Sequence, residues 1–316
     1  MRDVFNDAIN APAGRLAEIL LRKVTKEDTE LSGGLRARFD KLVDAPGRAG
    51  LLARVRLAAD VPFLFARAPK WTKSKLLPLF DWASPEAADI WSARKYANAI
   101  GAPELFGLLK KPFLELFSRQ DVQSEDLRTF AEWLAAILIV NQAENAGYPL
   151  EPTEARAALR RAGPTALTSV GHSLAVDMEG AKNKGERWRK VIGPVFQAIW
   201  PLDVELQTSA TTFKLVQILC ATGEAFPEAA DMIIPFIQHD EPHGHTTVYS
   251  IAEAPAQLYK ASPAKMLDLL AAIVGDAPAG SIYALGKALS RLRAIEPKLV
   301  ETRKFQKLLI CASQHG

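Results

Sequence analysis

The sequence predicts an all-α fold, organised as an irregular HEAT- or armadillo-like array of helices. Apolar residues recur at steps of three and four along most of the 316 residues. No segment combines sustained period-two alternation with Asn-Gly or Asp-Gly turns, so β-hairpins have no support. So many short amphipathic segments exceed what one four-helix bundle holds, and pairwise stacking is the economical way to bury them.

The segments follow one another with ordinary start and stop signals. Helices are expected over Leu16–Val24 and Leu35–Val43, separated by the polar, Gly-containing stretch Thr29–Gly34. Later starts are marked by Ser84, Ser124 and Ser262, each followed by Pro or acidic residues that suit a first helical turn. The remaining helices are expected over Leu51–Ala66, Lys73–Trp82, Ala87–Ala99, Glu104–Ser118, Glu125–Asn145, Pro152–Ala162, Pro164–Glu179, Glu186–Ile199, Ser209–Ala221, Pro227–Gln238, Val248–Lys260, Ala264–Val274, Ser281–Ala294 and Pro297–Ser313.

Length and composition favour one helical-array domain over residues 1–316, with an alternative subdivision near 148–152, where two prolines stiffen a connector. No fixed-period repeat is visible, so a compact irregular helical domain stays open as well. The apolar run Leu134–Val140 is far shorter than the roughly 20 residues of a membrane-spanning helix. With no secretory signal and only Cys220 and Cys311, we expect a cytoplasmic protein without a membrane partner.

Three strings resemble catalytic or ligand-binding motifs. Gly171-His172-Ser173-Leu174-Ala175 approximates a nucleophile elbow, but it has Ala in place of the last Gly and no preceding strand. Gly280–Ala288 resembles a phosphate loop with one residue too many between its glycines. Neither has its required context, so we expect no catalytic residue, no cofactor site and no enzyme. A hydrolase that depends on Ser173 or on the segment His239–His245 remains a third hypothesis.

The segment His239–His245 gathers three imidazoles and two carboxylates within seven residues. These are suitable zinc ligands, but all lie on one short loop without a cysteine, so we predict a polar turn and no metal site. His239, His243 and His245 are retained as candidate interaction residues.

Basic residues gather in two clusters although the formal net charge is only +3. Residues 36–75 contain ten Lys or Arg against three Asp, and residues 182–190 contain five against one Glu. With nearby tryptophans these clusters suit a phosphate-binding surface, whereas helical spacing favours solvated faces. The candidate surface residues are Arg54, Arg56, Lys70, Trp71, Lys73, Lys75, Lys184, Arg187 and Arg189.

Several segments resemble one family. The run Trp71–Trp82, which contains LLPLFDW, is similar to the helical C-terminal region of large bacterial proteins, many of which carry an N-terminal sirtuin-type NAD-consuming domain. The runs Trp188–Trp200 and Gly223–Ala229, and the segment from Glu241 into Val248–Ile251 and Ala264–Val274, resemble later parts of that region in the same order. The resemblance extends from about Gly14 to Lys307 and concerns packing motifs.

Proteins of that family are associated with anti-phage defence, so the resemblance implies a sensor, scaffold or regulatory region. The chain has no room for the NAD-consuming domain and none of its catalytic residues maps here, so the resemblance does not imply an NAD hydrolase. We expect a protein partner, either a defence effector or a phage component. Homo-oligomers and a helical-repeat nucleic-acid binder that uses residues 36–75 and 182–190 are the alternatives.

Overall fold

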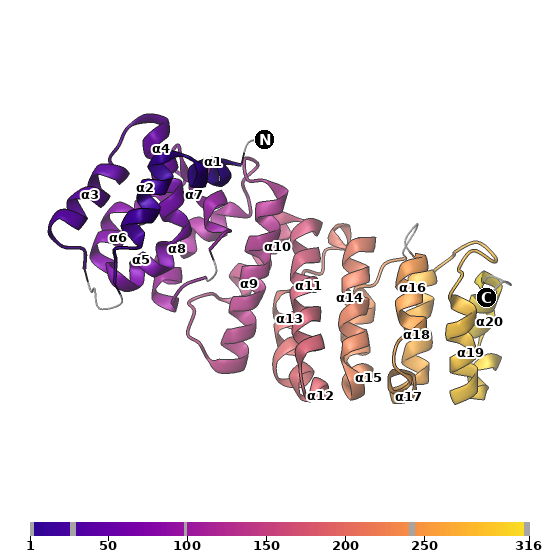
Figure 1. Cartoon of the computed structure of the whole chain (residues 1–316). Helices are drawn as coiled ribbons and strands as arrows, with labels where there is room; N and C mark the ends of the chain where they lie inside the picture. Colours follow the sequence, from indigo (N-terminus) through magenta and orange to yellow (C-terminus); the bar gives the residue numbers. More distant parts are fainter. Residues whose placement is uncertain (1–2, 26–29, 98–99, 240–243, 313–316) are drawn as a thin grey trace. The chain divides into compact units, whose positions relative to one another are not determined.

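The computed structural model describes residues 3–25, 30–97, 100–239 and 244–312, and these ranges form an all-α fold (Figure 1). Their extended pairing is limited to an isolated parallel bridge between Ile282 and Ala312. Internal contacts divide the chain into two compact units. Unit 1 comprises residues 1–133 and 146–151, and unit 2 comprises residues 134–145 and 152–316. The last of the three boundaries, after Glu151, falls in the segment where the sequence suggests a subdivision.

Unit 1 is a cluster of short helices around aromatic side chains. The indole of Trp91 contacts Phe80, Phe113 and Phe130 with ring centroids 4.9–6.1 Å apart, and its Nε1 donates to the Phe80 carbonyl. The helices are α1 (Val4–Asn10), α2 (Pro12–Leu21), α3 (Gly33–Val43), α4 (Gly47–Ala59), α5 (Val61–Arg67), α6 (Pro69–Lys75), the 3-10 turn η1 (Leu77–Phe80), α7 (Ala87–Arg94), α8 (Pro103–Leu116) and α9 (Ser124–Glu144), whose second half belongs to unit 2.

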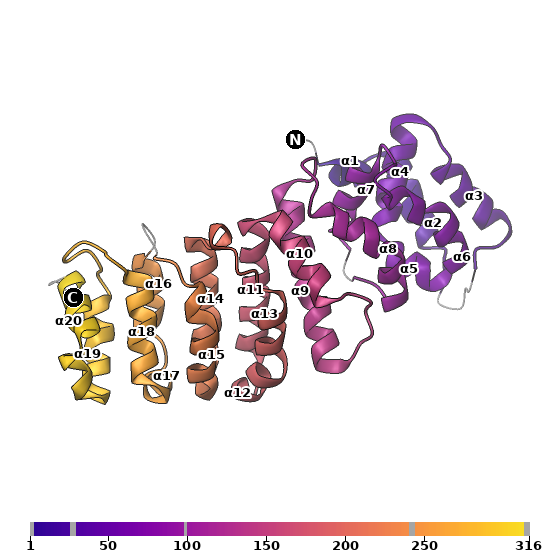
Figure 2. The ribbon, with the colours of Figure 1, turned by 180° about the vertical axis from the view of Figure 1, so that it is seen from behind.

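Unit 2 is a stack of antiparallel helix pairs in two layers (Figures 1 and 2). One layer contains α11, α14, α16 and α19 in order, and the other contains α13, α15, α18 and α20. The elements are α10 (Pro152–Ala162), α11 (Pro164–Gly180), α12 (Lys184–Arg187), the π-helical turn η2 (Trp188–Ile192), α13 (Gly193–Ile199), η3 (Val204–Leu206), α14 (Ser209–Ala221), η4 (Gly223–Ala225), α15 (Phe226–Ile233), η5 (Ile234–Phe236), α16 (Gly244–Ala252), α17 (Ala256–Ala261), α18 (Pro263–Val274), α19 (Leu285–Ile295), η6 (Pro297–Glu301) and α20 (Arg303–Cys311).

The stack has two edges with different connections. Loops that lead from the second layer back into the first, such as residues 200–208 and 275–284, lie along the edge that is uppermost in Figure 1. The turns that join the two helices of each pair, including Lys182–Gly185, lie along the opposite edge. We call these the upper and lower edges of unit 2.

Two of the expected helices are interrupted at a proline. The helix expected over Leu51–Ala66 divides at Asp60, where Pro62 starts α5, and the one expected over Val248–Lys260 divides at Pro255. The prediction of one continuous helix was therefore wrong in both places. Further differences are the helix α1, which was not among the expected helices, and the late start of α19, because Ile282 pairs with Ala312 instead of continuing the helical stripe. The helices expected over Lys73–Trp82 and Pro297–Ser313 are each divided as well, into α6 and η1 and into η6 and α20.

The π-helical turn η2 also follows from a proline. Pro194 has no N–H to donate to the carbonyl of Lys190, four residues earlier, so that acceptor is left over. Gln142 of α9 supplies the missing donor, because its Nε2 donates to the Lys190 carbonyl oxygen over 3.0 Å. The Gly193 N–H meanwhile bonds the Trp188 carbonyl, five residues back, which is the π-helical pattern.

Ion pairs connect successive helices of the second layer. Arg189 pairs with Glu228 of α15, Asp231 of α15 with Lys265 of α18, and Asp268 of α18 with Lys304 of α20. On α15 and α18 the two charged residues are three positions apart and therefore lie on the same side of the helix, where one pairs with the preceding element and the other with the following helix. We call these three ion pairs the charge ladder. They recur from helix to helix, although the sequence shows no fixed-period repeat.

Among the described residues, every helix falls short of the length and hydropathy needed to cross a bilayer.

Candidate interaction surfaces

Arg54 of the first basic cluster is a structural residue. Its side chain is 8% exposed and holds Glu86 through two bonds of 2.5 and 2.6 Å. Its remaining nitrogen donates to the carbonyls of Val43 and Ala45, which lie at the end of α3 and just beyond it. Arg54 therefore links the end of α3 and the start of α7 to α4. Its guanidinium is already engaged in these bonds and is not available to a binding partner.

Most of the other cations in residues 36–75 are neutralised as well. Six of the ten cations, including Arg54, form ion pairs with carboxylates. The partners are Asp40, Glu86, Asp7, Asp60, Glu104 and Asp44. Three of these acids lie outside the segment. The paired candidates are Arg54 with Glu86, Arg56 with Asp60, Lys73 with Glu104 and Lys75 with Asp44.

The last two candidates of this cluster, Trp71 and Lys70, differ in the exposure of their side chains. Trp71 is buried against Phe39 and its Nε1 donates to Asp40 over 2.8 Å, which is the core role that tryptophans take by default. The side chain of Lys70 is exposed. The structure therefore does not assemble Arg54, Arg56, Lys70, Trp71, Lys73 and Lys75 into one free basic surface.

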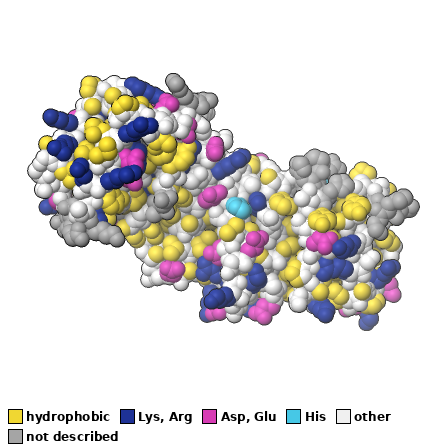
Figure 3. All heavy atoms as spheres, in the orientation of Figure 1, with side chains coloured by type: hydrophobic (Ala, Val, Ile, Leu, Met, Phe, Trp, Pro, Cys, Tyr) yellow, Lys and Arg dark blue, Asp and Glu magenta, His cyan; other side chains and the backbone are white. Residues whose placement is uncertain are grey.

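The second cluster, residues 182–190, is also internally balanced. Arg187 forms a two-bond pair with Asp177 at 2.6 and 2.7 Å, and Lys190 pairs with Glu186 at 2.7 Å. Arg189 bonds both Glu228 and Glu224, which raises the pKa of its guanidinium further above the usual range. Lys184 donates to the last carbonyls of α11, at Met178 and Glu179. Figure 3 accordingly shows acidic and basic side chains intermixed over the lower part of unit 2.

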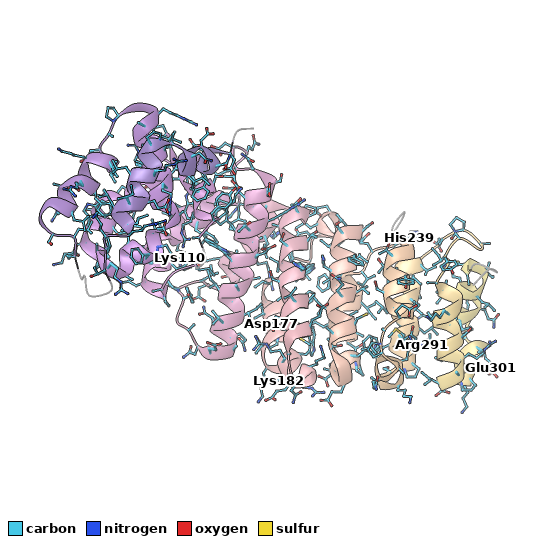
Figure 4. All side chains as sticks on the ribbon, in the orientation of Figure 1. Lys110, Asp177, Lys182, His239, Arg291 and Glu301 are labelled. Carbon is cyan, nitrogen blue, oxygen red and sulfur yellow. The ribbon has the colours of Figure 1, made fainter. Side chains whose placement is uncertain are left out.

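Two open hollows flank the turn Lys182–Gly185 at the lower edge, where Figure 4 labels Lys182. One, of about 580 Å³, includes Val176 and the Arg187–Asp177 pair, and the other, of about 720 Å³, includes Lys260 and Gln257. Lys182 and Lys260 are exposed and have no ion-pair partner among the residues that the structure describes. They are two cations of this edge that remain available to solvent or ligands.

The histidine segment is only partly within the described ranges. His243 lies outside them, and of His245 only the backbone is described, in the first turn of α16. His239 is at the upper edge (Figure 4), where its Nδ1 lies 3.0 Å from the Ile273 carbonyl oxygen and Gly275 leaves room for its ring. The described residues contain no group of three or more His, Cys, Asp or Glu suited to a metal ion.

Ser173 occupies the middle of the continuous helix α11 and donates to the Ser169 carbonyl over 3.2 Å. No strand or sharp turn presents it, so the geometry of a nucleophile elbow is absent from α11. Gly280 and Ile282 likewise bond the backbone at the end of α20 through their N–H groups instead of forming a phosphate loop.

The upper edge exposes apolar side chains that are not among the candidate residues expected from the sequence. Leu202, Val204 and Tyr283 are 63–73% exposed, and Tyr249 on α16 is 54% exposed. Figure 3 shows hydrophobic side chains along this edge. We call these four residues the apolar ridge. The sequence contains a signal for two of them, because Leu202 and Val204 are apolar residues that lie between the helices expected over Glu186–Ile199 and Ser209–Ala221.

One cavity in unit 1 has five acidic residues and one lysine in its lining. It measures about 360 Å³ and includes Asp89, Asp126 and Lys95, the last two joined by a buried ion pair. Burial raises the pKa of Asp89, an effect that nearby Arg48 opposes and Glu86 reinforces. No described residue forms a hydrogen bond or an ion pair with the Asp89 carboxylate.

Comparison with known proteins identifies one distant likeness. The chain is 21% identical over 320 residues to the uncharacterised protein y4cA of Sinorhizobium fredii (strain NBRC 101917 / NGR234). The alignment covers 99% of the chain and 26% of that protein, so the chain spans about a quarter of the length of this relative. No family model matches the chain, and no solved structure matches it.

Proposed function

We propose that the chain is a protein–protein interaction module, serving as a sensor, scaffold or regulatory region of a prokaryotic anti-phage defence protein or system in the cytoplasm. The observation that carries the interaction role is the apolar ridge of unit 2, where four large side chains are more than half exposed. Exposed apolar groups gathered on one edge mark surfaces that lose contact with water when a partner binds.

The charge distribution favours a protein over a nucleic acid as the partner. A nucleic-acid surface needs cations that are free to replace counterions at phosphates. In the two basic clusters, most cations instead bond carboxylates or carbonyls of their own unit. Contact through helix edges and loops is also how stacked helical arrays commonly bind partners.

The defence role rests on the resemblance of residues 14–307 to the helical region of sirtuin-type defence proteins. The chain aligns with only about a quarter of the longer relative, which supports a module that acts as one region of a larger protein or assembly. Binding of a trigger would act by favouring one assembly state of an effector, which requires different affinities for the two states.

Site-specific photocrosslinking tests the interaction role. A photoreactive residue is placed at Leu202 or Tyr283 of the full chain, expressed in its native host, and irradiated before and after phage infection. We expect a discrete protein adduct at both ridge positions and none at Lys298, an exposed lower-edge residue that serves as the matched control. A nucleic-acid adduct, or equal adducts at all three positions, would overturn the proposal.

Phage challenge tests the defence role separately. Deletion of the gene should raise the plating efficiency of at least one phage of the host, and the unaltered gene should restore protection. Leu202→Glu combined with Tyr283→Glu should fail to restore it, whereas Lys298→Glu should succeed. Equal plating with and without the gene across the host's phages would contradict a defence role.

A further inference from the structure

A small cavity opens between the first halves of α14 and α16, beside the apolar ridge. It measures about 220 Å³ and its described lining is Ser209, Ala210, Phe213 and Thr246. Pockets for whole small molecules measure about 300–1,000 Å³, so this one suits a single side chain. Its walls are largely apolar, which favours an aliphatic or aromatic side chain.

The surroundings of the cavity extend its apolar surface. Tyr249 lies three residues after Thr246 on α16, so the two share one face of that helix. Because the Tyr249 side chain is exposed, it can cover a residue seated in the cavity. Such an anchor in a pocket, with a neighbouring aromatic, is the usual arrangement of a strongly contributing interface residue.

Lys214 is not among the lining residues, but its ammonium lies close to Phe213 of the cavity wall. Its Nζ lies 5.4 Å from the centroid of the Phe213 ring and 2.9 Å from Gln217 Oε1. The side chain is half-buried, and none of the carboxylates that the structure describes pairs with it. On neighbouring helices, Lys265, Lys287 and Lys304 each have a carboxylate of this chain as partner.

We propose that the cavity between α14 and α16 receives an apolar side chain from an acidic segment of a partner protein, whose adjacent carboxylate pairs with Lys214. Charge complementarity decides the occupant, because an apolar pocket next to a cation without a carboxylate selects a ligand with both features. This inference rests on the proposed function and names the chemistry of the partner.

Two matched probes test it on the full chain. N-acetyl-L-phenylalanine carries an aromatic side chain and a carboxylate, and N-acetyl-L-phenylalaninamide carries the same side chain without the charge. With ¹³C-labelled Ala and Thr methyl groups, titration of either probe should shift the Ala210 and Thr246 resonances. The carboxylate probe should bind about threefold more tightly, as an exposed ion pair allows.

Variants separate the contribution of the Lys214 charge from that of the apolar cavity. Lys214→Met should abolish the threefold preference and leave amide binding unchanged, whereas Lys260→Met, at the lower edge, should preserve it. Ala210→Phe should fill the cavity and weaken both probes at least fivefold. Equal affinities of the two probes for the unaltered chain, or unchanged Ala210 and Thr246 resonances, would overturn the inference.

Failure of this inference is distinguishable from failure of the proposed function. Photocrosslinks at Leu202 and Tyr283 without any binding of the two probes would overturn the occupant assigned to the cavity and leave the interaction role. A ridge adduct that consists of a second copy of the chain would overturn the acidic segment as occupant if Lys214→Met leaves its yield unchanged.

Discussion

Gly171 of α11 lies directly against Lys214 of α14, since a Cβ on Gly171 would be 2.9 Å from the Lys214 Cβ and 3.6 Å from the Trp200 ring. Real Cβ contacts are not this short, so the two helices approach as closely as they do because residue 171 has no side chain. The glycine that suggests a nucleophile elbow in the sequence therefore serves helix packing inside the stack.

Replacing Gly171 by Ala should destabilise the protein. Overpacking costs about 1–3 kcal/mol, and the better helix propensity of Ala offsets about 1 kcal/mol of that. Urea unfolding should show a net loss near 1 kcal/mol. Gly180→Ala is the control within α11, because a Cβ there meets nothing within 4 Å, and it should leave stability unchanged or slightly raised. Equal effects of both substitutions would contradict the close approach.

Removal of Arg54 should be more costly than removal of an exposed cation. Arg54→Met leaves the Glu86 carboxylate and the carbonyls of Val43 and Ala45 without their donor, so we expect a loss of about 3 kcal/mol. Lys190→Met, which breaks the exposed pair with Glu186, should cost at most about 1 kcal/mol. Thermal unfolding of the two variants compares them, and similar melting temperatures would argue against a structural role for Arg54.

The raised pKa of Asp89 predicts a defined dependence of stability on pH. Burial is the main cause, and the protonated carboxyl is favoured in the folded state. Its stabilising contribution is complete below the ordinary pKa of 3.8 and is lost as pH rises through the folded-state pKa. Asp89→Asn should therefore melt higher than the unaltered chain at pH 7, and the difference should vanish near pH 3.

Asp121 provides the control of opposite sign for Asp89. The pair with Arg119 lowers the pKa of Asp121, so its charge stabilises the folded state at neutral pH and this contribution is lost as pH falls. Asp121→Asn should melt no higher than the unaltered chain at pH 7. An increase in melting temperature for both variants would point to a general charge effect instead.

The charge ladder between α15 and α18 predicts a pair-specific effect. Lys265→Glu places a third acid beside Asp231 and Asp268, and should destabilise by about 1 kcal/mol at low ionic strength. Adding Asp231→Lys should recover much of the loss, because the pair is then restored with reversed sign. The free energy of unfolding at low and high salt checks both. A loss that the second substitution cannot reverse would show that Lys265 acts by other means.

Cys220 should be unreactive in the folded chain. Burial raises the pKa of its thiol to about 12, so almost no thiolate exists near neutral pH. Cys311 is buried and its Sγ lies 3.2 Å from the Ala277 carbonyl oxygen. We expect slow modification of both by a disulfide reagent at pH 8 in buffer and rapid modification in urea. Fast stoichiometric reaction of the native protein would contradict the packing around α14.

Local patterns were sufficient for the helices. Ser209–Ala221 is a helix over the residues expected, and Pro152–Ala162 likewise, since an apolar stripe with spacing of three and four and a polar or proline start are properties of neighbouring residues. One kind of error occurs where two helices follow each other without a polar linker. Asp60 and Pro62 interrupt what reads as one stripe, because both helices bury their apolar residues in the same core.

The candidate site depended on information that neighbouring residues do not contain. The sequence by itself determined an all-α chain with two basic segments, but whether those cations are free was decided by carboxylates on other helices, such as Glu86 for Arg54 and Glu228 for Arg189. Likewise, only the tertiary structure decided that Gly171 meets Lys214 and that Leu202 and Tyr283 remain exposed. The physical reason is that helix periodicity acts over four residues, whereas charge pairing and burial act between helices separated by thirty to forty residues of chain.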